Sequence, residues 1–524
     1  MLRETVARIL GVPEPPLRRG QLDLAVDIND AMTGWGGGAP GHVLGCAPTG
    51  VGKAFAGLVP SMLAAVRGER TVLSTESLAL QAQIIDKDAP EVAETISRLT
   101  GYRPSVAVAK GWGNYVCALQ AYTTTVEALV AAGRPEPPSP PAHQLAPQQV
   151  SEMFSGLAYQ LDVTRSPART RGPRFDPKVT LGGREYPRAE SFDLLGWAVS
   201  QIADGEDGDR SRYTGAVPDG VWSTVSVAPS ECAKTSCPFQ LVCRPATARK
   251  IAADADIVVV NHSLLAVQAA NQIPVVFGGK LGTFHHLVVD EAHGLPGKVR
   301  DQGAVEVSPV GVYRLARMVE RTFGSAHGIT HDVADALVRD GSDLADQLER
   351  ALSAFLARTD QRRAVKFDPQ DNPLAELAPT LLSWAATSAN LVPDGYESLP
   401  ARDMLRMRRY LAKLETFVQQ VTDAVNESPG MARWVDRPHG QVDGFVLGRG
   451  WSGASLHVSP VDVSFAIAAN LFSAPFPVEG TDGEEFEVLP LSVTMMSATL
   501  PVGFGRQVGI TERVASYPSP FDDA

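Results

Sequence analysis

A glycine-rich loop that ends in a lysine is the first feature of the sequence that could do chemistry. The stretch reads "GCAPTGVGKA" and covers residues 45–54. The backbone N–H groups of such a loop, at the start of a helix, form a cradle for anions, and a lysine adds positive charge for terminal phosphates. Gly50 and Gly52 allow the close approach, and Lys53 supplies the charge. The loop therefore predicts a site for the phosphates of a nucleotide.

Two positions depart from the general G-x-x-x-x-G-K-[ST] pattern. Ala47 stands where the first glycine is usual, and Ala54 stands where a serine or threonine hydroxyl would bind magnesium. Without that hydroxyl the metal loses a protein ligand, so we expect hydrolysis to suffer more than nucleotide binding. Taken alone, the loop also fits a glycine turn beside an unrelated lysine.

An acidic pair follows an apolar run in "LVVDEAH", where Asp290, Glu291 and His293 lie. Open parallel sheets bind ligands at the carboxyl ends of their strands, where an aspartate can hold magnesium and a glutamate can orient water. By itself, an acidic pair after a strand is usually a solvated helix start. Together with the phosphate loop, it predicts nucleotide hydrolysis.

Four of the five cysteines form a candidate metal site. Cys232, Cys237 and Cys243 have the spacing C-x4-C-x5-C, and Cys117 lies upstream in "KGWGNYVC". Four thiolates suit an iron–sulfur cluster or a closed zinc site. Zinc sites usually contain C-x2-C pairs, which this sequence lacks, so the spacing favours iron–sulfur. Scattered buried cysteines are the alternative, and we expect this for Cys46 beside the phosphate loop.

The elements that must position these residues indicate an α/β fold. Short apolar runs at 42–46, in "RTVLSTES", in "DADIVVVNHSLL" and in "FHHLVVDEAH" are typical of buried parallel strands, and we expect them in one sheet. Residues 306–427 read as a helical insertion, and apolar side chains every three or four residues from Met404 to Val425 predict an amphipathic helix. A chain of 524 residues is too long for one core, so several domains are expected.

Charge and hydropathy exclude two classes of protein. A net charge of −12 argues against a protein that coats nucleic acid through an overall positive charge, although a narrow basic groove is compatible with this net charge. No apolar run approaches the roughly 18 residues that a membrane helix needs, and the N-terminus has acid and proline where a signal peptide is apolar. We therefore expect a cytoplasmic protein without a membrane partner.

The motifs jointly resemble the XPD/DinG family of superfamily 2 DNA helicases, in particular its bacterial and phage DinG-like branch. "RRGQLDLA" is similar to the family's adenine-reading segment, and "APTGVGKA" to motif I, where Ala47 is normal. "STESLALQAQIIDKDAP" resembles motif Ia, "VVDEAH" the DEAH box of motif II, and "MMSATLP" motif III. The four cysteines match the family's 4Fe-4S ligands. These matches follow the family order from about residue 18 to the end.

The resemblance implies a RecA-like P-loop motor domain with an inserted iron–sulfur cluster domain and an inserted α-helical arch domain. We expect the first part of the motor domain at 1–107, the cluster domain at 108–250 and a second motor part at 251–300. The arch would cover 301–430, and the last motor part 431–524.

The resemblance also implies roles for particular residues. Lys53 would hold the β and γ phosphates of ATP, Asp290 the Mg²⁺ shell, and Glu291 the attacking water. His293 and residues 497–499 would couple the nucleotide to DNA. The expected nucleotide-binding residues are Gln21, Ala47, Pro48, Thr49, Gly50, Val51, Gly52, Lys53 and Ala54. The expected 4Fe-4S ligands are Cys117, Cys232, Cys237 and Cys243.

The DNA partner implied by the resemblance is single-stranded or forked, with movement from 5′ to 3′ and a role in DNA repair. Two basic groups are candidate contacts, although a solvated face is the commoner explanation of any one such run. The first group is Arg165, Arg169, Arg171, Arg174 and Lys178, and the second is Arg402, Arg406, Arg408 and Arg409.

The chain stops at "ASYPSPFDDA", which resembles the segment that leads into the family's second RecA-like domain. We therefore expect the N-terminal half of a helicase: a fragment, one chain of a pair with a second polypeptide, or a motor that has given up translocation. The competing function is a non-motor module that binds single-stranded DNA with weak or no ATP hydrolysis. A third hypothesis is an unrelated P-loop NTPase with a structural zinc site.

Overall fold

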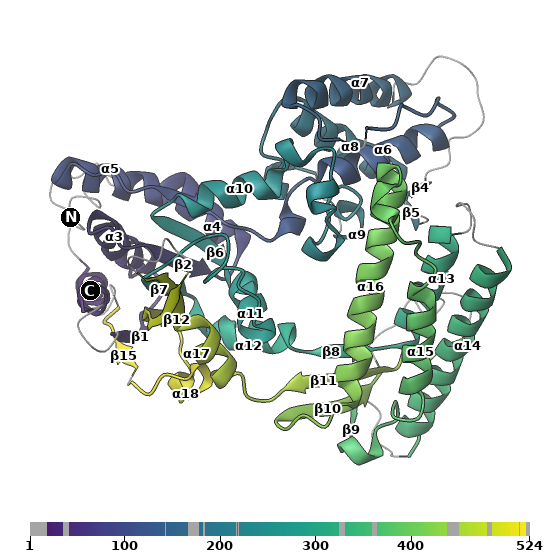
Figure 1. Cartoon of the computed structure of the whole chain (residues 1–524). Helices are drawn as coiled ribbons and strands as arrows, with labels where there is room; N and C mark the ends of the chain where they lie inside the picture. The colour runs from purple at the N-terminus through teal and green to yellow at the C-terminus, as the bar shows by residue number, and fades with distance from the viewer. Residues whose placement is uncertain are drawn as a thin grey trace. The chain divides into compact units, whose positions relative to one another are not determined.

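The computed structural model divides the chain into two compact units, which are described separately (Figure 1). The residues that it describes are 18–34, 41–141, 143–165, 178–181, 184–215, 217, 219–323, 331–358, 364–437, 450–478, 485–512 and 514–519. Unit 1 consists of Met1–Lys110, Ala246–Gly303 and Pro460–Ala524, and unit 2 of Gly111–Pro245 and Ala304–Ser459.

Unit 1 is built on a seven-stranded sheet in which every pair of neighbours is parallel. In spatial order its strands are β15 (Ala515–Ser516), β1 (His42–Cys46), β14 (Ser492–Ser497), β7 (His286–Asp290), β2 (Thr71–Thr75), β6 (Ile257–Asn261) and β3 (Val106–Val108). The four apolar runs that the sequence predicted as strands of one sheet are β1, β2, β6 and β7, which confirms that prediction.

Helices bury both faces of this sheet. Because successive side chains of a strand point to opposite faces, Val288 and Met496 join one core while Leu287, Val289 and Met495 join the other. The first core includes α2 (Arg19–Thr33), α3 (Lys53–Val66) and α5 (Ala89–Thr100). The second includes α11 (His262–Asn271), α12 (Leu295–Gln302), α17 (Ser464–Leu471) and α18 (Phe504–Val508). This two-sided burial explains why the strands are continuous apolar runs.

Unit 1 also contains shorter elements outside the sheet. They are α4 (Leu78–Gln83), most of α10 (Arg244–Ala253), and the antiparallel pair β12 (Ser473–Pro477) and β13 (Phe486–Pro490).

Unit 2 is mainly helical and has two hydrophobic cores. The first gathers α6 (Ala118–Ala131), α7 (Pro147–Arg165), α8 (Arg188–Ala203) and α9 (Asp219–Trp222), beside the strands β4 (Lys178–Leu181) and β5 (Arg184–Pro187). The second gathers α13 (Pro309–Phe323), α14 (His331–Leu356), α15 (Ala378–Ala389) and α16 (Ala401–Val425). The helical insertion that the sequence predicted within 306–427 is thus confirmed as helices.

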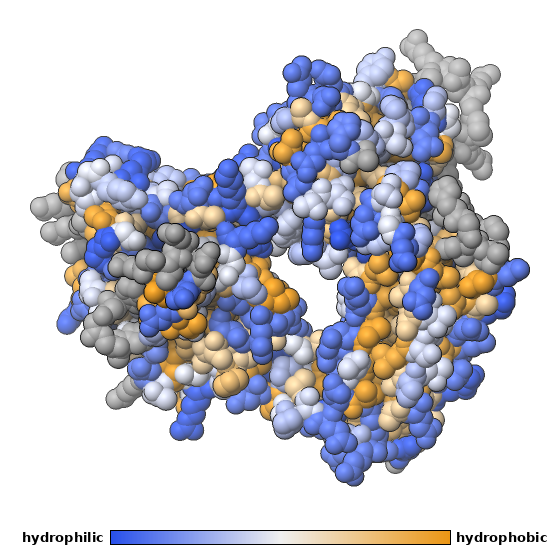
Figure 2. Space-filling view, in the orientation of Figure 1, coloured by the Kyte–Doolittle hydropathy of each residue, from blue (hydrophilic) through white to orange (hydrophobic). Residues whose placement is uncertain are grey.

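Helix α16 contributes to both cores of unit 2. Met404 belongs to the first core, whereas Met407, Leu414 and Val421 belong to the second. The predicted amphipathic helix is therefore confirmed, although Val418 of the predicted stripe is 37% exposed. In the view of Figure 2, hydrophobic residues reach the surface along the α15 and α16 part of unit 2.

One expected boundary is wrong. We expected all of 431–524 in the motor domain, but residues up to Ser459 lie in unit 2. The reason is strand pairing: β10 (Met431–Asp436) and β11 (Ser455–Pro460) complete a four-stranded sheet of order β8-β11-β10-β9. In this sheet β10 pairs antiparallel with β9 (Ala364–Lys366), and β11 with β8 (Val305–Val307). Unit 2 therefore extends beyond residue 430, to Ser459.

Within the part of the chain that the structure describes, no helix combines the length and the apolar character needed to cross a membrane.

Close helix packing in unit 2 predicts the effect of one substitution. A Cβ at Gly341 in α14 would lie 2.6 Å from Trp384 Cζ2 and 2.7 Å from Ala316 Cβ. Gly341→Ala should therefore lower the free energy of unfolding by about 1–3 kcal/mol, despite alanine's higher helix propensity. Urea unfolding followed by tryptophan fluorescence measures this.

The matched control is Gly156→Ala in α7, where an added Cβ meets nothing within 4 Å. That change should raise stability by about 0.5–1 kcal/mol. Stabilisation by both alanines would contradict the close packing at Gly341.

Candidate functional site

The glycine-rich loop joins the end of β1 to the start of α3. Gly50 and Gly52 have φ values of 85° and 95°, in the left-handed region that favours glycine. A Cβ at Gly52 would also lie 2.1 Å from Nε2 of Gln21. The loop therefore needs glycine at position 52 for two reasons, its backbone conformation and the side chain packed against it.

Two side chains at the beginning of α2 bind the carbonyls of this loop. Gln21 Nε2 donates to the carbonyl oxygen of Gly52 at 3.1 Å, and Arg18 Nη1 donates to the carbonyl oxygen of Gly50. The structure thus places Gln21, one of the expected nucleotide-binding residues, at the loop. We did not single out Arg18, although it lies in the same "RRGQLDLA" segment as Gln21.

Lys53 connects the loop to the acidic pair. Its side chain is buried, with Nζ 3.2 Å from Oε1 of Glu291 and 3.3 Å from the carbonyl oxygen of Ala47, to which it donates. Of the other predicted loop residues, Val51 is buried, Pro48 and Ala54 are half-buried, and Thr49 is exposed. The structure therefore brings together the lysine and the glutamate that the sequence proposed for one site.

Asp290 is the last residue of β7 and is buried. Its Oδ1 accepts a hydrogen bond from the backbone N–H of Glu291 at 3.0 Å. Burial, followed by the negative charge of Glu291, raises its pKa to about 6, against the opposing effect of Lys53. A buried carboxylate of this kind gains from a bound cation, so the donor chemistry fits a divalent metal ion.

Glu291 has the opposite electrostatic behaviour. Burial acts to raise its pKa, but Lys53 and a hydrogen bond from Ser497 outweigh burial and lower it. Ser497 Oγ donates to Glu291 Oε2 at 2.9 Å, and His293 Nδ1 lies 2.9 Å from the same Ser497 Oγ. Two neighbouring carboxylates, one with a raised pKa and one with a lowered pKa, are typical of active sites in which each carboxylate has a different chemical role.

A buried histidine that the sequence analysis missed also contacts this site. His262 Nε2 lies 3.2 Å from the backbone oxygen of Glu291, and its Nδ1 lies 2.8 Å from Ser74 Oγ. His262 was visible in "VVVNHSLL" directly after a predicted strand, in the position where parallel sheets present ligand-binding residues.

The four candidate cluster ligands lie near one another in unit 2. Cys117 directly precedes α6, while Cys232, Cys237 and Cys243 each follow a short 3-10 turn. Burial raises the pKa of Cys117 to about 12, and the charges of Cys243 and Cys232 add to this rise. The pKa of Cys237 is raised by burial and then by the other three thiols.

These cysteines do not form a single-ion site in the structure. All five cysteines of the chain are free thiols. Across the described residues, no group of three or more histidine, cysteine, aspartate or glutamate side chains is arranged to hold one metal ion. The predicted iron–sulfur cluster is therefore not shown.

The second group of candidate DNA contacts is largely engaged within unit 2. Arg406 Nη2 lies 2.6 Å from Glu127 Oε1, and Arg402 pairs with the same carboxylate at 3.4 Å. Arg409 Nε lies 3.1 Å from Oε2 of the buried Glu231. These contacts join α16 to the cysteine-bearing part of unit 2. The structure gives Arg408 no such ion pair among the residues it describes.

The first group lies mostly outside the described residues, including Arg169, Arg171 and Arg174. Arg165 ends α7, and Lys178 Nζ lies 2.9 Å from Oε2 of Glu185 on the surface.

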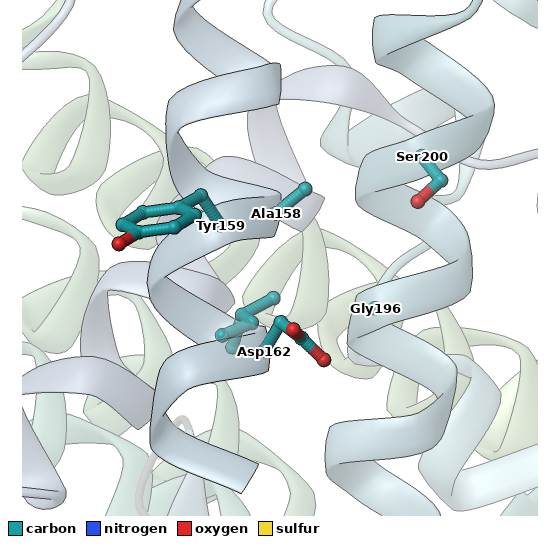
Figure 3. Close-up of a pocket in the computed structure, with 6 residues that line it drawn as sticks. Ala158, Tyr159, Asp162, Gly196 and Ser200 are labelled. Atoms are coloured by element: carbon teal, nitrogen blue, oxygen red, sulfur yellow. The ribbon is translucent and has the colours of Figure 1, made fainter. Parts of the chain in front are cut away.

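A separate pocket of about 350 Å³ lies between α7 and α8 in unit 2 (Figure 3). In the close-up, Ala158 and Asp162 point from α7 toward α8, whereas Tyr159 points away. Its lining residues are Ala158, Tyr159, Leu161, Asp162, Gly196 and Ser200. They include no lysine or arginine for phosphate, so the pocket does not duplicate the site of unit 1.

The parallel sheet, the glycine loop and the acidic pair at the strand ends define unit 1 as a P-loop α/β domain. No protein-family model matches the chain. The ATP-dependent helicase DinG of Mycobacterium tuberculosis (strain ATCC 25177 / H37Ra) is 31% identical over 307 residues, which cover 58% of this chain and 38% of that protein. The ATP-dependent DNA helicase DinG of Escherichia coli (strain K12) is 28% identical over 303 residues, covering 57% of this chain and 34% of that protein.

Over the matched region this chain is therefore similar to the DinG helicases, in keeping with the resemblance that its motifs indicate. The matched region is little more than a third of each relative's length. Among solved structures, S. tokodaii Xpd4 has a TM-score of 0.37 and 11% identity, covering 91% of this chain and 57% of that one. This TM-score is too low to establish a shared fold.

The raised pKa of Asp290 predicts a pH-dependent stability difference. Because the folded-state pKa of about 6 lies above the ordinary 3.8, burial of Asp290 lowers the free energy of unfolding progressively as pH rises from about 4 to about 6, and the full loss is present above about pH 6. Asp290→Asn should therefore raise the free energy of unfolding by up to about 3 kcal/mol at pH 8, with no difference below about pH 4. Urea titrations between pH 8 and pH 4 in EDTA measure this.

The control is Asp301→Asn, an exposed aspartate on α12 of the same unit, where the substitution removes no buried charge. A difference for Asp290→Asn that stayed constant with pH would contradict the buried charge.

Proposed function

We propose that unit 1 binds and hydrolyses ATP and that the chain serves an ATP-dependent DNA helicase of DinG type. The observation that carries the proposal is the 3.2 Å contact between Lys53 Nζ and Glu291 Oε1, beside the buried Asp290. This contact joins the phosphate-binding loop, at the carboxyl end of β1, to the acidic pair at the carboxyl end of β7. This is the edge of an open parallel sheet where ligands bind.

Each residue at this edge has a role that fits its surroundings. Lys53 and the backbone N–H groups of the loop would hold the β and γ phosphates. Glu291, whose pKa is lowered, accepts hydrogen bonds and would orient the attacking water. Asp290 would hold Mg²⁺, which neutralises phosphate charge when bound. His293 and Ser497, hydrogen-bonded to each other, would link Glu291 to the rest of the sheet.

Action on DNA depends on the relatives, which are named as helicases. Single-stranded or forked DNA and movement from 5′ to 3′ are parts of the proposal that follow from the family resemblance. The second candidate function is a single-stranded-DNA-binding module without a working motor, because Ala54 provides no hydroxyl for Mg²⁺. The relatives give no support for a second polypeptide that completes the motor.

We further propose that Cys117, Cys232, Cys237 and Cys243 hold a 4Fe-4S cluster in unit 2. Burial raises the pKa of Cys117 and of Cys237, and the neighbouring thiols add to the rise, in keeping with four side chains that lie near one another. When bound, the cluster would supply rigid cross-links between the α6 end and the three 3-10 turns.

ATP hydrolysis is the first test of the proposed function. We expect anaerobically purified protein to hydrolyse ATP faster with single-stranded DNA than without it. Lys53→Ala should reduce turnover at least about a hundredfold, because the charge that stabilises the transferring phosphate is lost. A phosphate-release assay measures this.

The matched control is Lys298→Ala, an exposed lysine on α12 of the same unit, which should leave turnover unchanged. Equal loss in both variants would contradict the role of Lys53. Absence of turnover in the unaltered protein, with DNA binding intact, would favour the non-motor module.

Metal analysis tests the cluster. We expect about four iron atoms and four acid-labile sulfides per chain, with a brown colour, as a 4Fe-4S cluster requires. Cys237→Ser should lose most of this iron, whereas Cys46→Ser, outside the proposed ligand set, should retain it. Stoichiometric zinc without sulfide would contradict the proposal and favour the zinc alternative.

A further inference from the structure

A buried hydrogen-bonded pair, Ser74 and His262, supports the backbone of the acidic site. His262 begins α11, directly after β6, and Ser74 lies in the neighbouring strand β2. Both side chains have an exposed fraction of 0%. His262 Nδ1 lies 2.8 Å from Ser74 Oγ, and Nε2 lies 3.2 Å from the backbone oxygen of Glu291. The imidazole therefore connects β2 to the residue that follows β7.

The partners of His262 determine its tautomer. A backbone carbonyl can only accept a hydrogen bond, so Nε2 of His262 must carry the proton. Nδ1 is then an acceptor and receives a hydrogen bond from the Ser74 hydroxyl. Burial lowers the pKa of His262 to about 4, so the ring is neutral at physiological pH. The Glu291 carbonyl thus fixes the tautomer, and the hydrogen bond with Ser74 holds the ring in the orientation that donates to Glu291.

Glu291 has a backbone conformation that needs such support. Its φ of 53° and ψ of 42° are left-handed, which costs a residue with a side chain roughly 1–2 kcal/mol. The Gly294 N–H donates to the same carbonyl oxygen of Glu291 at 3.2 Å. Rotation of this peptide would move the Glu291 carboxylate away from its contacts with Lys53 at 3.2 Å and Ser497 at 2.9 Å.

We propose that His262, oriented by Ser74, is a positioning residue for ATP hydrolysis, which holds Glu291 in its left-handed conformation and so aims its carboxylate. The inference rests on the proposed function of unit 1. His262 touches neither the glycine loop nor Lys53 in any contact that the structure gives for the described residues. Substitution of His262 should therefore slow the chemical step of ATP hydrolysis and leave nucleotide binding unchanged.

The opposite end of the sheet provides a control for a purely structural role. His286, at the start of β7, also has an exposed fraction of 0%. Its Nδ1 lies 2.9 Å from Ser492 Oγ and its Nε2 lies 3.1 Å from Glu69 Oε2. His286 therefore matches His262 in burial and in its serine partner, but it lies away from the acidic pair.

The test compares two variants in which an amide side chain replaces the imidazole, His262→Gln and His262→Asn. Glutamine can place a donor near the former Nε2, whereas the shorter asparagine reaches only the position of Nδ1. His262→Asn should lower kcat for ATP about ten- to a hundredfold with KM within about twofold, since small misplacement of a catalytic group is costly. His262→Gln should restore kcat to within about fivefold of the unaltered protein. His286→Asn should lower the Tm and leave kcat per folded molecule unchanged.

Equal kcat losses in His262→Asn and His286→Asn, or a parallel rise in KM, would overturn the inference. Crystal structures provide a readout that needs no turnover and so separates this inference from the proposed function. A positive φ at Glu291 in the unaltered protein and in His262→Gln, lost in His262→Asn, would support the inference even in a chain that does not hydrolyse ATP. Retention of the left-handed conformation in His262→Asn would overturn it.

Discussion

The site in unit 1 depends on the ion pair between Lys53 and Glu291. Lys53 is buried and Glu291 is half-buried, so neither charge is well solvated, and the separation of one from the other would leave a costly unpaired charge. The pair forms because β1 and β7 both lie next to β14 and end at the same edge of the sheet. The parallel register of these strands is therefore the condition for the chemistry proposed above.

The same pair separates the properties of two adjacent carboxylates. Lys53 and Ser497 keep Glu291 ionised, whereas Asp290, one residue earlier and more deeply buried, has a pKa raised to about 6. The left-handed backbone at Glu291 allows this difference in pKa, because it turns the Glu291 carboxylate away from the direction of strand β7. The hydrogen bonds from His262 and Gly294 to the Glu291 carbonyl then offset part of the strain of that backbone.

In unit 2, ion pairs join helix α16 to neighbouring segments. The arginines of α16 that the sequence offered as DNA contacts pair instead with Glu127 and with the buried Glu231. Glu231 directly precedes Cys232, so α16 is joined to the segment that carries three of the four candidate cluster ligands. Burial alone would raise the pKa of Glu231, but Arg409 and Lys413 lower it, and the carboxylate remains a partner for both. The basic face of α16 thus contributes to the internal organisation of unit 2.

Local patterns in the sequence determined β1, β2, β6 and β7 of the parallel sheet, the phosphate loop, the acidic pair and helix α16, because periodicity and motif spacing act over a few residues. The tertiary structure alone decided the 3.2 Å contact of Lys53 with Glu291, the place of β10 and β11 in unit 2, and the partners of Arg406 and Arg409. It also decided the support of Glu291 by His262. These contacts join residues far apart in the chain, and they depend on strand order and burial, which no local pattern encodes.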